Sequence, residues 1–156
     1  MADKATGSSS ASIFLDEIKS AISGGINYEP KDSNDKWVFA EVAVDSSGAL
    51  ISTSQDYMGS GVAVHGNDKV MWVAVKNLST TATEGICLSF DGGTAAYDLV
   101  DGVFIGAGEL VILKCPNTTT ANLTAASVTM DGTYGYPTGA LSGNVNVHVA
   151  AILDDV

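Results

Sequence analysis

The chain has 156 residues, of which 46 % are hydrophobic and 16 % charged, and its formal net charge is −11. This size fits one domain with a core of its own, and the composition is far from that of a disordered chain. All seven basic residues are lysines, against 18 acidic residues. The clustered cations that grip phosphate backbones are therefore missing, which argues against nucleic acid and anionic membranes as partners.

The N-terminal part of the chain is predicted to form a unit of its own, residues 1–25. Residues 1–11 are small, polar and Ser-rich, which is typical of a flexible arm. A short amphipathic helix is expected over Ser12–Ser23, because apolar residues recur at a spacing of four and Gly24-Gly25 supplies a stop. Such a short helix must bury its apolar side, either on its own domain or on a neighbouring protein. The candidate partner-binding residues on that side are Phe14, Leu15, Ile18 and Ile22.

Residues 26–156 are predicted to form a β-sandwich domain. Short apolar or alternating segments, separated by Gly, Pro, Asn and Asp, are expected as strands at 37–44, 49–53, 69–77, 86–90, 97–100, 103–105, 109–115, 123–130 and 145–153. No long helical segment intervenes, which argues against a parallel α/β fold. About eight or nine short strands at this spacing indicate an all-β, antiparallel sandwich or jelly roll.

Two long connections between the predicted strands carry three of the five tyrosines. Tyr57 falls in the connection 54–68, and Tyr134 and Tyr136 fall in the connection 131–143. Aromatic rings in loops can stack on a sugar or on side chains of a partner. These three rings are therefore the candidates for a carbohydrate- or receptor-binding site.

The sequence offers no recognisable reaction centre. His65 and His148 belong to no metal-spaced cluster, and no G-x-S-x-G motif is present. The carboxylates of Asp32-Ser33-Asn34-Asp35 are predicted to decorate a solvated turn, and Asp154-Asp155 lie at the chain end. We therefore expect no enzymatic activity, no cofactor and no metal. An enzyme stays the third alternative, which a pocket that gathers a histidine with carboxylates would revive.

The start of the sequence and the two cysteines predict where the protein is made. The segment MADKATGSSSAS lacks the apolar core of a secretory signal, and no apolar run approaches the length of a membrane span. Synthesis in a reducing cytoplasm is expected, where Cys87 and Cys115 would be free thiols. A disulfide between them is the alternative.

The middle of the chain carries a family resemblance. The stretch VKNLSTTATEGICLSFDGGTAAYDLVDGVFIGAGELVILK runs from a strand ending in Asn-x-Ser to an alternating strand ending in Asp-Gly-Gly, and then through Gly-rich steps to an apolar strand. Over about residues 70–115 the chain resembles the small β-sandwich structural proteins of tailed-phage virions, most of all head decoration (cement) proteins. The resemblance implies a β-sandwich, no activity, the major capsid protein as partner and the surface of the virion head as location.

This resemblance gives the first functional hypothesis, a capsid decoration protein made in the host cytoplasm that binds and reinforces the outside of a phage head. A homo-oligomer is expected, with a trimer favoured. The acidic charge suits the outside of a particle better than its DNA-facing interior. The alternative is a carbohydrate- or receptor-binding module at the tail or on the head surface.

Overall fold

The computed structural model describes residues 4–14, 19–31, 34–46, 48–59, 61–92 and 102–155. Within these ranges every regular element is a β-strand, and all pairings are antiparallel, so the prediction of an all-β antiparallel fold is confirmed. The strands are β1 (Ala5–Phe14), β2 (Lys19–Tyr28), β3 (Lys36–Val44), β4 (Gly48–Ala49), β5 (Lys69–Asn77), β6 (Glu84–Ser89), β7 (Val103–Ile105), β8 (Leu110–Leu113), β9 (Thr124–Met130), β10 (Pro137–Ala140) and β11 (Val145–Asp154). The strand predicted at 97–100 lies outside the described residues.

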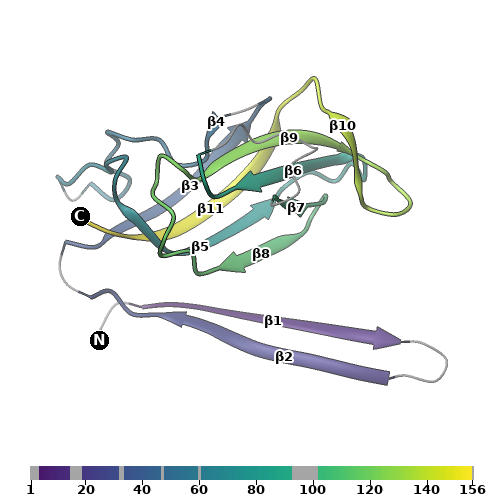
Figure 1. The fold of residues 1–156 in the computed structure, drawn as a ribbon, viewed down its shortest axis with the longest axis horizontal. Coiled ribbons are helices and arrows are strands. Elements are labelled where there is room, and N and C mark those ends of the chain that lie inside the picture. Colours follow the sequence, from purple (N-terminus) through teal and green to yellow (C-terminus); the bar gives the residue numbers. More distant parts are fainter. Residues whose placement is uncertain are drawn as a thin grey trace.

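Nine of the strands form two sheets (Figure 1). The first sheet has the order β3-β11-β5-β8, and the second has the order β10-β9-β6-β7 with β4 also paired to β9. Strand β10 forms inside the region predicted as a long loop. The C-terminal strand β11 lies between β3 and β5, so the end of the chain is tied to the centre of the first sheet.

The main core lies between the two sheets and follows the alternation of the strands. From β11, Val145, Val147 and Val149 point into this core and are fully buried, and Ile86 and Leu88 of β6 meet them. The intervening side chains of β11 face outward, as the period of two requires. The alternation predicted for these two strands is therefore confirmed.

A β-bulge in β5 places apolar side chains on both faces of the first sheet. Ile152 pairs with Trp72, but the next residue, Leu153, pairs with Val70, so Met71 is the extra residue. Val70 thereby joins the main core although it is three residues before Val73, which also faces the core. Trp72 and Ile152 remain on the outer face, where a second apolar cluster forms.

Strands β1 and β2 form a hairpin that pairs only with itself, and Figure 1 shows it as a separate ribbon beside the sandwich. The predicted helix over Ser12–Ser23 is not present: residues 12–14 and 19–23 are strand residues, and 15–18 lie outside the described residues. A spacing of four puts side chains on one face of a strand as well as of a helix, and Ser and Gly are poor helix formers.

The hairpin overlaps both the predicted flexible arm and the predicted domain boundary. Residues 5–11, predicted to belong to a flexible arm, form most of β1. The boundary expected at residue 25 falls within β2. The division into residues 1–25 and 26–156 stays a prediction.

Candidate docking surface

The base of the hairpin is fixed to the outer face of the first sheet. Ala5 is buried there with Trp72 and Ile152, and Ile26 and Tyr28 pack against the same cluster. Further along β1 the backbone comes close to β8. A Cβ atom added to Gly7 would lie only 2.6 Å from Cδ1 of Ile112, so a larger residue here would force the Ile112 side chain or the hairpin to shift.

Beyond its base, residues 8–10 and 22–25 of the hairpin are exposed. Ser8, Ser9 and Ser10 are exposed on β1, and on β2 the side chain of Ile22 is 70 % exposed. Register pairs Ala11 with Ile22 and ends with Phe14 opposite Lys19. The exposed part is thus a narrow polar ribbon that presents a large apolar side chain to solvent.

Two of the four predicted partner-binding residues belong to the described strands of the hairpin. Ile22 is exposed on β2, and Phe14 is the last residue of β1. Leu15 and Ile18 lie outside the described residues. Sequence reasoning placed the four residues on a helix, whereas the strand register puts Phe14 and Ile22 in one hairpin.

An apolar groove opens beside the hairpin base. It has a volume of about 270 Å³ and is lined by Ala5, Trp37, Phe39, Met58 and Trp72, among others. Phe39 is 66 % exposed and Met58 60 % exposed, which is unusual for large apolar side chains. Nε1 of Trp72 is buried without a hydrogen-bond partner. The groove therefore offers apolar contact area on the side of the hairpin.

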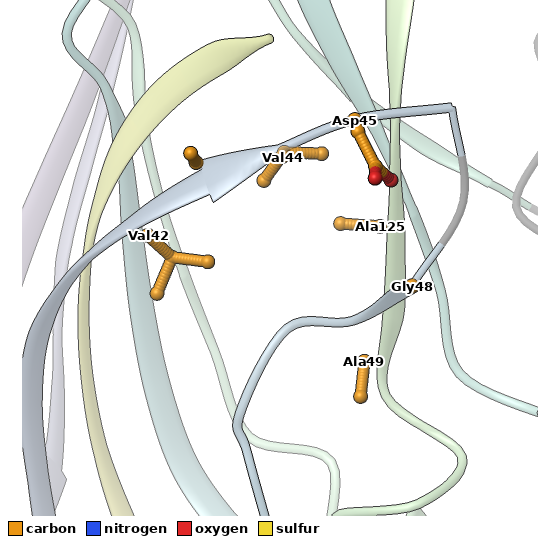
Figure 2. A pocket seen from close by; sticks show the side chains of 7 residues that line it. Val42, Val44, Asp45, Gly48, Ala49 and Ala125 are labelled. Atoms are coloured by element: carbon orange, nitrogen blue, oxygen red, sulfur yellow. The ribbon is translucent and has the colours of Figure 1, made fainter.

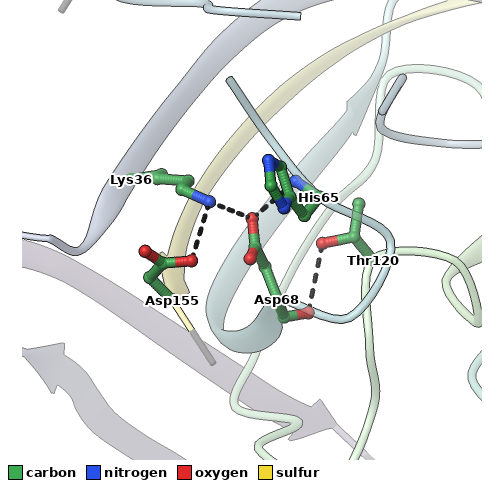
Figure 3. Close-up of polar contacts among 5 residues, drawn as sticks. All are labelled: Lys36, His65, Asp68, Thr120 and Asp155. Carbon is green, nitrogen blue, oxygen red and sulfur yellow. Dashed lines mark hydrogen bonds and ion pairs between the residues drawn. The ribbon is translucent and has the colours of Figure 1, made fainter. Parts of the chain in front are cut away.

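A buried ion-pair cluster connects the start and the end of the sandwich (Figure 3). Lys36 begins β3, Asp68 directly precedes β5, and Asp155 directly follows β11. Nζ of Lys36 lies 2.8 Å from Oδ2 of Asp68 and 3.0 Å from Oδ1 of Asp155. The side chains of Lys36 and Asp68 are 5 % and 0 % exposed, and that of Asp155 is 38 % exposed.

Backbone groups hold Asp68 in this cluster. The backbone N–H of His65 donates to Oδ2 of Asp68 at 2.8 Å, and the Thr120 hydroxyl donates to the Asp68 carbonyl oxygen at 3.2 Å. Burial lowers the pKa of Lys36, but the bonds and charges of the two aspartates outweigh it and raise that pKa above its ordinary value. The Lys36 contact holds the pKa of Asp155 below its usual range. Sequence reasoning missed this cluster because its members are far apart in the chain.

The three loop tyrosines have different environments. Tyr134 and Tyr136 are 78 % and 54 % exposed, with ring centroids 6.3 Å apart and planes 16° from parallel. Oδ1 of Asp131 accepts the Tyr134 backbone N–H at 2.7 Å and helps to fix the turn. Tyr57 instead packs against the core and accepts the Ser52 backbone N–H at 2.9 Å. Only Tyr134 and Tyr136 keep the exposure that a stacking site requires.

The other residues singled out in the sequence form no reaction centre in the described part. His148 lies 3.8 Å from Glu41 on the outer face of the first sheet, while the His65 side chain is exposed. Asp35, predicted in a solvated turn, is in fact buried and accepts the Lys31 backbone N–H at 2.8 Å. Among the described residues no group of three or more His, Cys, Asp or Glu could hold a metal ion.

A smaller hollow of about 180 Å³ lies where β3 ends and β4 meets β9 (Figure 2). Val42, Val44 and Ala125 contribute to its walls, and Asp45 is its single charged lining residue. The other residues that line it are aliphatic or glycine.

Fold and surface together define an all-β protein of antiparallel sheets. Comparison with protein-family models, curated proteins and solved structures finds no match for the chain. In the part of the chain that the structure describes, no helix has the length and apolar character needed to cross a bilayer.

Proposed function

We propose that the protein is a virion structural protein, a decoration (cement) protein that binds the outer surface of a tailed-phage head and reinforces it. Its partner is the major capsid protein, and it acts as a homo-oligomer, with a trimer favoured. The resemblance of residues 70–115 to such proteins supports this proposal. Reinforcement would come from contact area shared among neighbouring capsid subunits.

The observation that carries the proposal is the exposed hairpin. A two-stranded ribbon is at best marginally stable alone in water, and β1 and β2 pair only with each other. Its far half presents Ile22 to solvent. Docking on a neighbouring subunit would bury Ile22 and give the far half of the ribbon the packing partner that only its base has on the first sheet.

The groove beside the hairpin base supports docking through the same side of the molecule. Phe39 and Met58 expose their side chains on the same side of the molecule as the hairpin base. Large exposed apolar groups that lie close together are typical of interaction surfaces. Hairpin and groove would thus form one continuous contact surface.

Binding to bare capsids tests the proposal. We expect saturable co-sedimentation of the purified protein, weakened at least about tenfold by Ile22→Asp, since a charge would be buried at the contact. The matched control is Tyr134→Ser with Tyr136→Ser, which changes an exposed apolar pair at another site and should leave capsid binding unchanged. Absence of saturable binding by the unmodified protein would overturn the proposal.

A carbohydrate- or receptor-binding module is the second candidate, and one observation favours it. Tyr134 and Tyr136 present exposed, nearly parallel rings from a fixed turn, a geometry suited to stacking on a sugar. A glycan array followed by titration would reveal such binding. Under this alternative the double Tyr→Ser variant loses sugar binding, and Ile22→Asp keeps it.

A further inference from the structure

The Lys36 cluster places an amine and two carboxyl groups in reaction geometry. Nζ of Lys36 contacts Oδ1 of Asp155 at 3.0 Å, which brings the amine next to the Asp155 carboxyl carbon. Oδ2 of the second carboxyl group, that of Asp68, lies 2.8 Å from the same Nζ. Groups held at such distances react with high effective concentration.

Burial makes this arrangement different from a surface ion pair. Lys36 and Asp68 are almost completely removed from solvent, and Oδ1 of Asp68 is buried without a hydrogen-bond partner. Charges in such a place carry a desolvation cost. Joining Lys36 to Asp155 would remove one positive and one negative charge. Asp68 would then stay as the ionisable group of the cluster, with the new amide N–H beside it as a donor in place of the ammonium.

We propose that Lys36 and Asp155 condense to an intramolecular isopeptide bond, with Asp68 as the proton-transfer group. The ion pair favours the charged forms of Lys36 and Asp155, so the reaction begins with a proton transfer that neutralises both groups. The Lys36 ammonium gives a proton to Asp68, which passes it to the Asp155 carboxylate, and the nitrogen lone pair then attacks the carbon of the protonated Asp155 carboxyl group. After the attack, Asp68 takes a second proton from the nitrogen and passes it to the departing oxygen. Both protons end on the departing Asp155 oxygen, so one C–N bond forms, one C–O bond breaks and one water leaves. Asp68 is regenerated, and no oxidant or other reactant is required.

The position of the bond gives it a structural consequence. Lys36 pairs with Leu153 at the end of the β3–β11 ladder, and Asp155 follows two residues later. The bond would cross-link β3 and β11 at this end of their ladder and would join residues 119 positions apart in the chain. A cross-link over so long a loop restricts the unfolded chain strongly, as disulfides do.

Intact-mass spectrometry of the purified full chain tests the proposal. We expect a mass lower by one water, about 18 Da, than the sequence predicts after allowance for the initiator methionine. Lys36→Arg and Asp155→Ala should both have their full calculated masses. Asp154→Ala is the matched control, because it removes the adjacent carboxylate, and it should keep the loss. Peptide mapping should find Lys36 and Asp155 in one branched peptide.

Two results would overturn the inference. One is the full calculated mass for the unmodified protein after prolonged incubation. The other is a water loss that persists in Lys36→Arg, since dehydration would then have occurred elsewhere. Asp155→Asn offers a further check, because condensation with an amide would release ammonia and lower the mass by about 17 Da. The outcome is independent of capsid binding.

Discussion

Cys115 shows how local burial controls reactivity. Its side chain is partly buried against the main core, and burial raises the pKa of its thiol to about 11 because a thiolate is poorly solvated there. Both cysteines are free in the structure, so the alternative of a disulfide is not realised, and Cys87 is fully buried.

This environment makes the alkylation of Cys115 strongly pH-dependent. At pH 8 almost all of the thiol is protonated, so modification by iodoacetamide should be much slower than for a free cysteine. The rate should rise as pH approaches about 11. Mass spectrometry of the native protein over time measures this, and rapid labelling of Cys115 at pH 8 would contradict the assigned environment.

Asn77 is a polar residue that the core requires. It is fully buried, its Nδ2 donates to the carbonyl oxygens of Glu84 and Ile105 at 3.1 and 3.3 Å, and its Oδ1 accepts the Ser79 backbone N–H at 2.8 Å. These bonds tie the end of β5 to β6 and β7. The hydrogen bonds of the Asn77 side chain therefore connect the first sheet to the second sheet at the end of β5.

Removal of this amide should destabilise the fold. Asn77→Ala leaves buried backbone groups without partners, and we expect a loss of about 2–4 kcal/mol in the free energy of unfolding. Asn117→Ala is the matched control, since Asn117 is exposed and begins the same kind of Asn-x-Ser/Thr triplet. Urea denaturation compares the two variants, and equal midpoints would contradict the role given to Asn77.

At the scale of elements, the contact between the hairpin and β8 depends on Gly7. A larger side chain at this position meets Ile112, whereas at Gly24, in the partner strand, nothing lies within 4 Å of an added Cβ. Gly7→Val should therefore cost about 1–3 kcal/mol through overpacking and loosen the hairpin base. Trp72 lies in the cluster beneath that base, so its fluorescence should shift to the red. Gly24→Val should leave the emission unchanged; an equal effect of both variants would argue against this packing.

The elements differ in how far the sequence predicts them. Val145, Val147 and Val149 alternate with polar residues, a pattern that fits only a half-buried strand. The spacing of Phe14, Ile18 and Ile22 fits both a helix and a strand, so local pattern could not decide between them. The pairing of β1 with β2 selects the strand conformation. This pairing depends on both segments together, so neither segment predicts it alone.

The candidate sites were predictable only in part, for the same reason. The exposure of Tyr134 and Tyr136 follows from their place in a Gly-rich turn. The cluster of Lys36, Asp68 and Asp155 arises where β3, β5 and β11 lie side by side, and the order of strands in a sheet cannot be read from composition or periodicity. Tertiary topology brought these residues together.

At the scale of the whole molecule, acidity and the distribution of apolar side chains fit the proposed position on the outside of a phage head. A net charge of −11 opposes contact with packaged DNA and keeps free copies apart in solution. Hairpin and groove gather exposed apolar groups on one side. The remaining surface can then face solvent while this side is docked.

Capsid reinforcement is the central claim, and the thermal stability of the capsid tests it most directly. Differential scanning calorimetry would compare bare capsids, capsids saturated with the protein, and capsids mixed with the Ile22→Asp variant at the same concentration. We expect saturated capsids to melt at a higher temperature, because docking to the assembled shell stabilises it by mass action, and the variant to give little or no rise. Saturable binding with an unchanged capsid melting temperature would contradict the account.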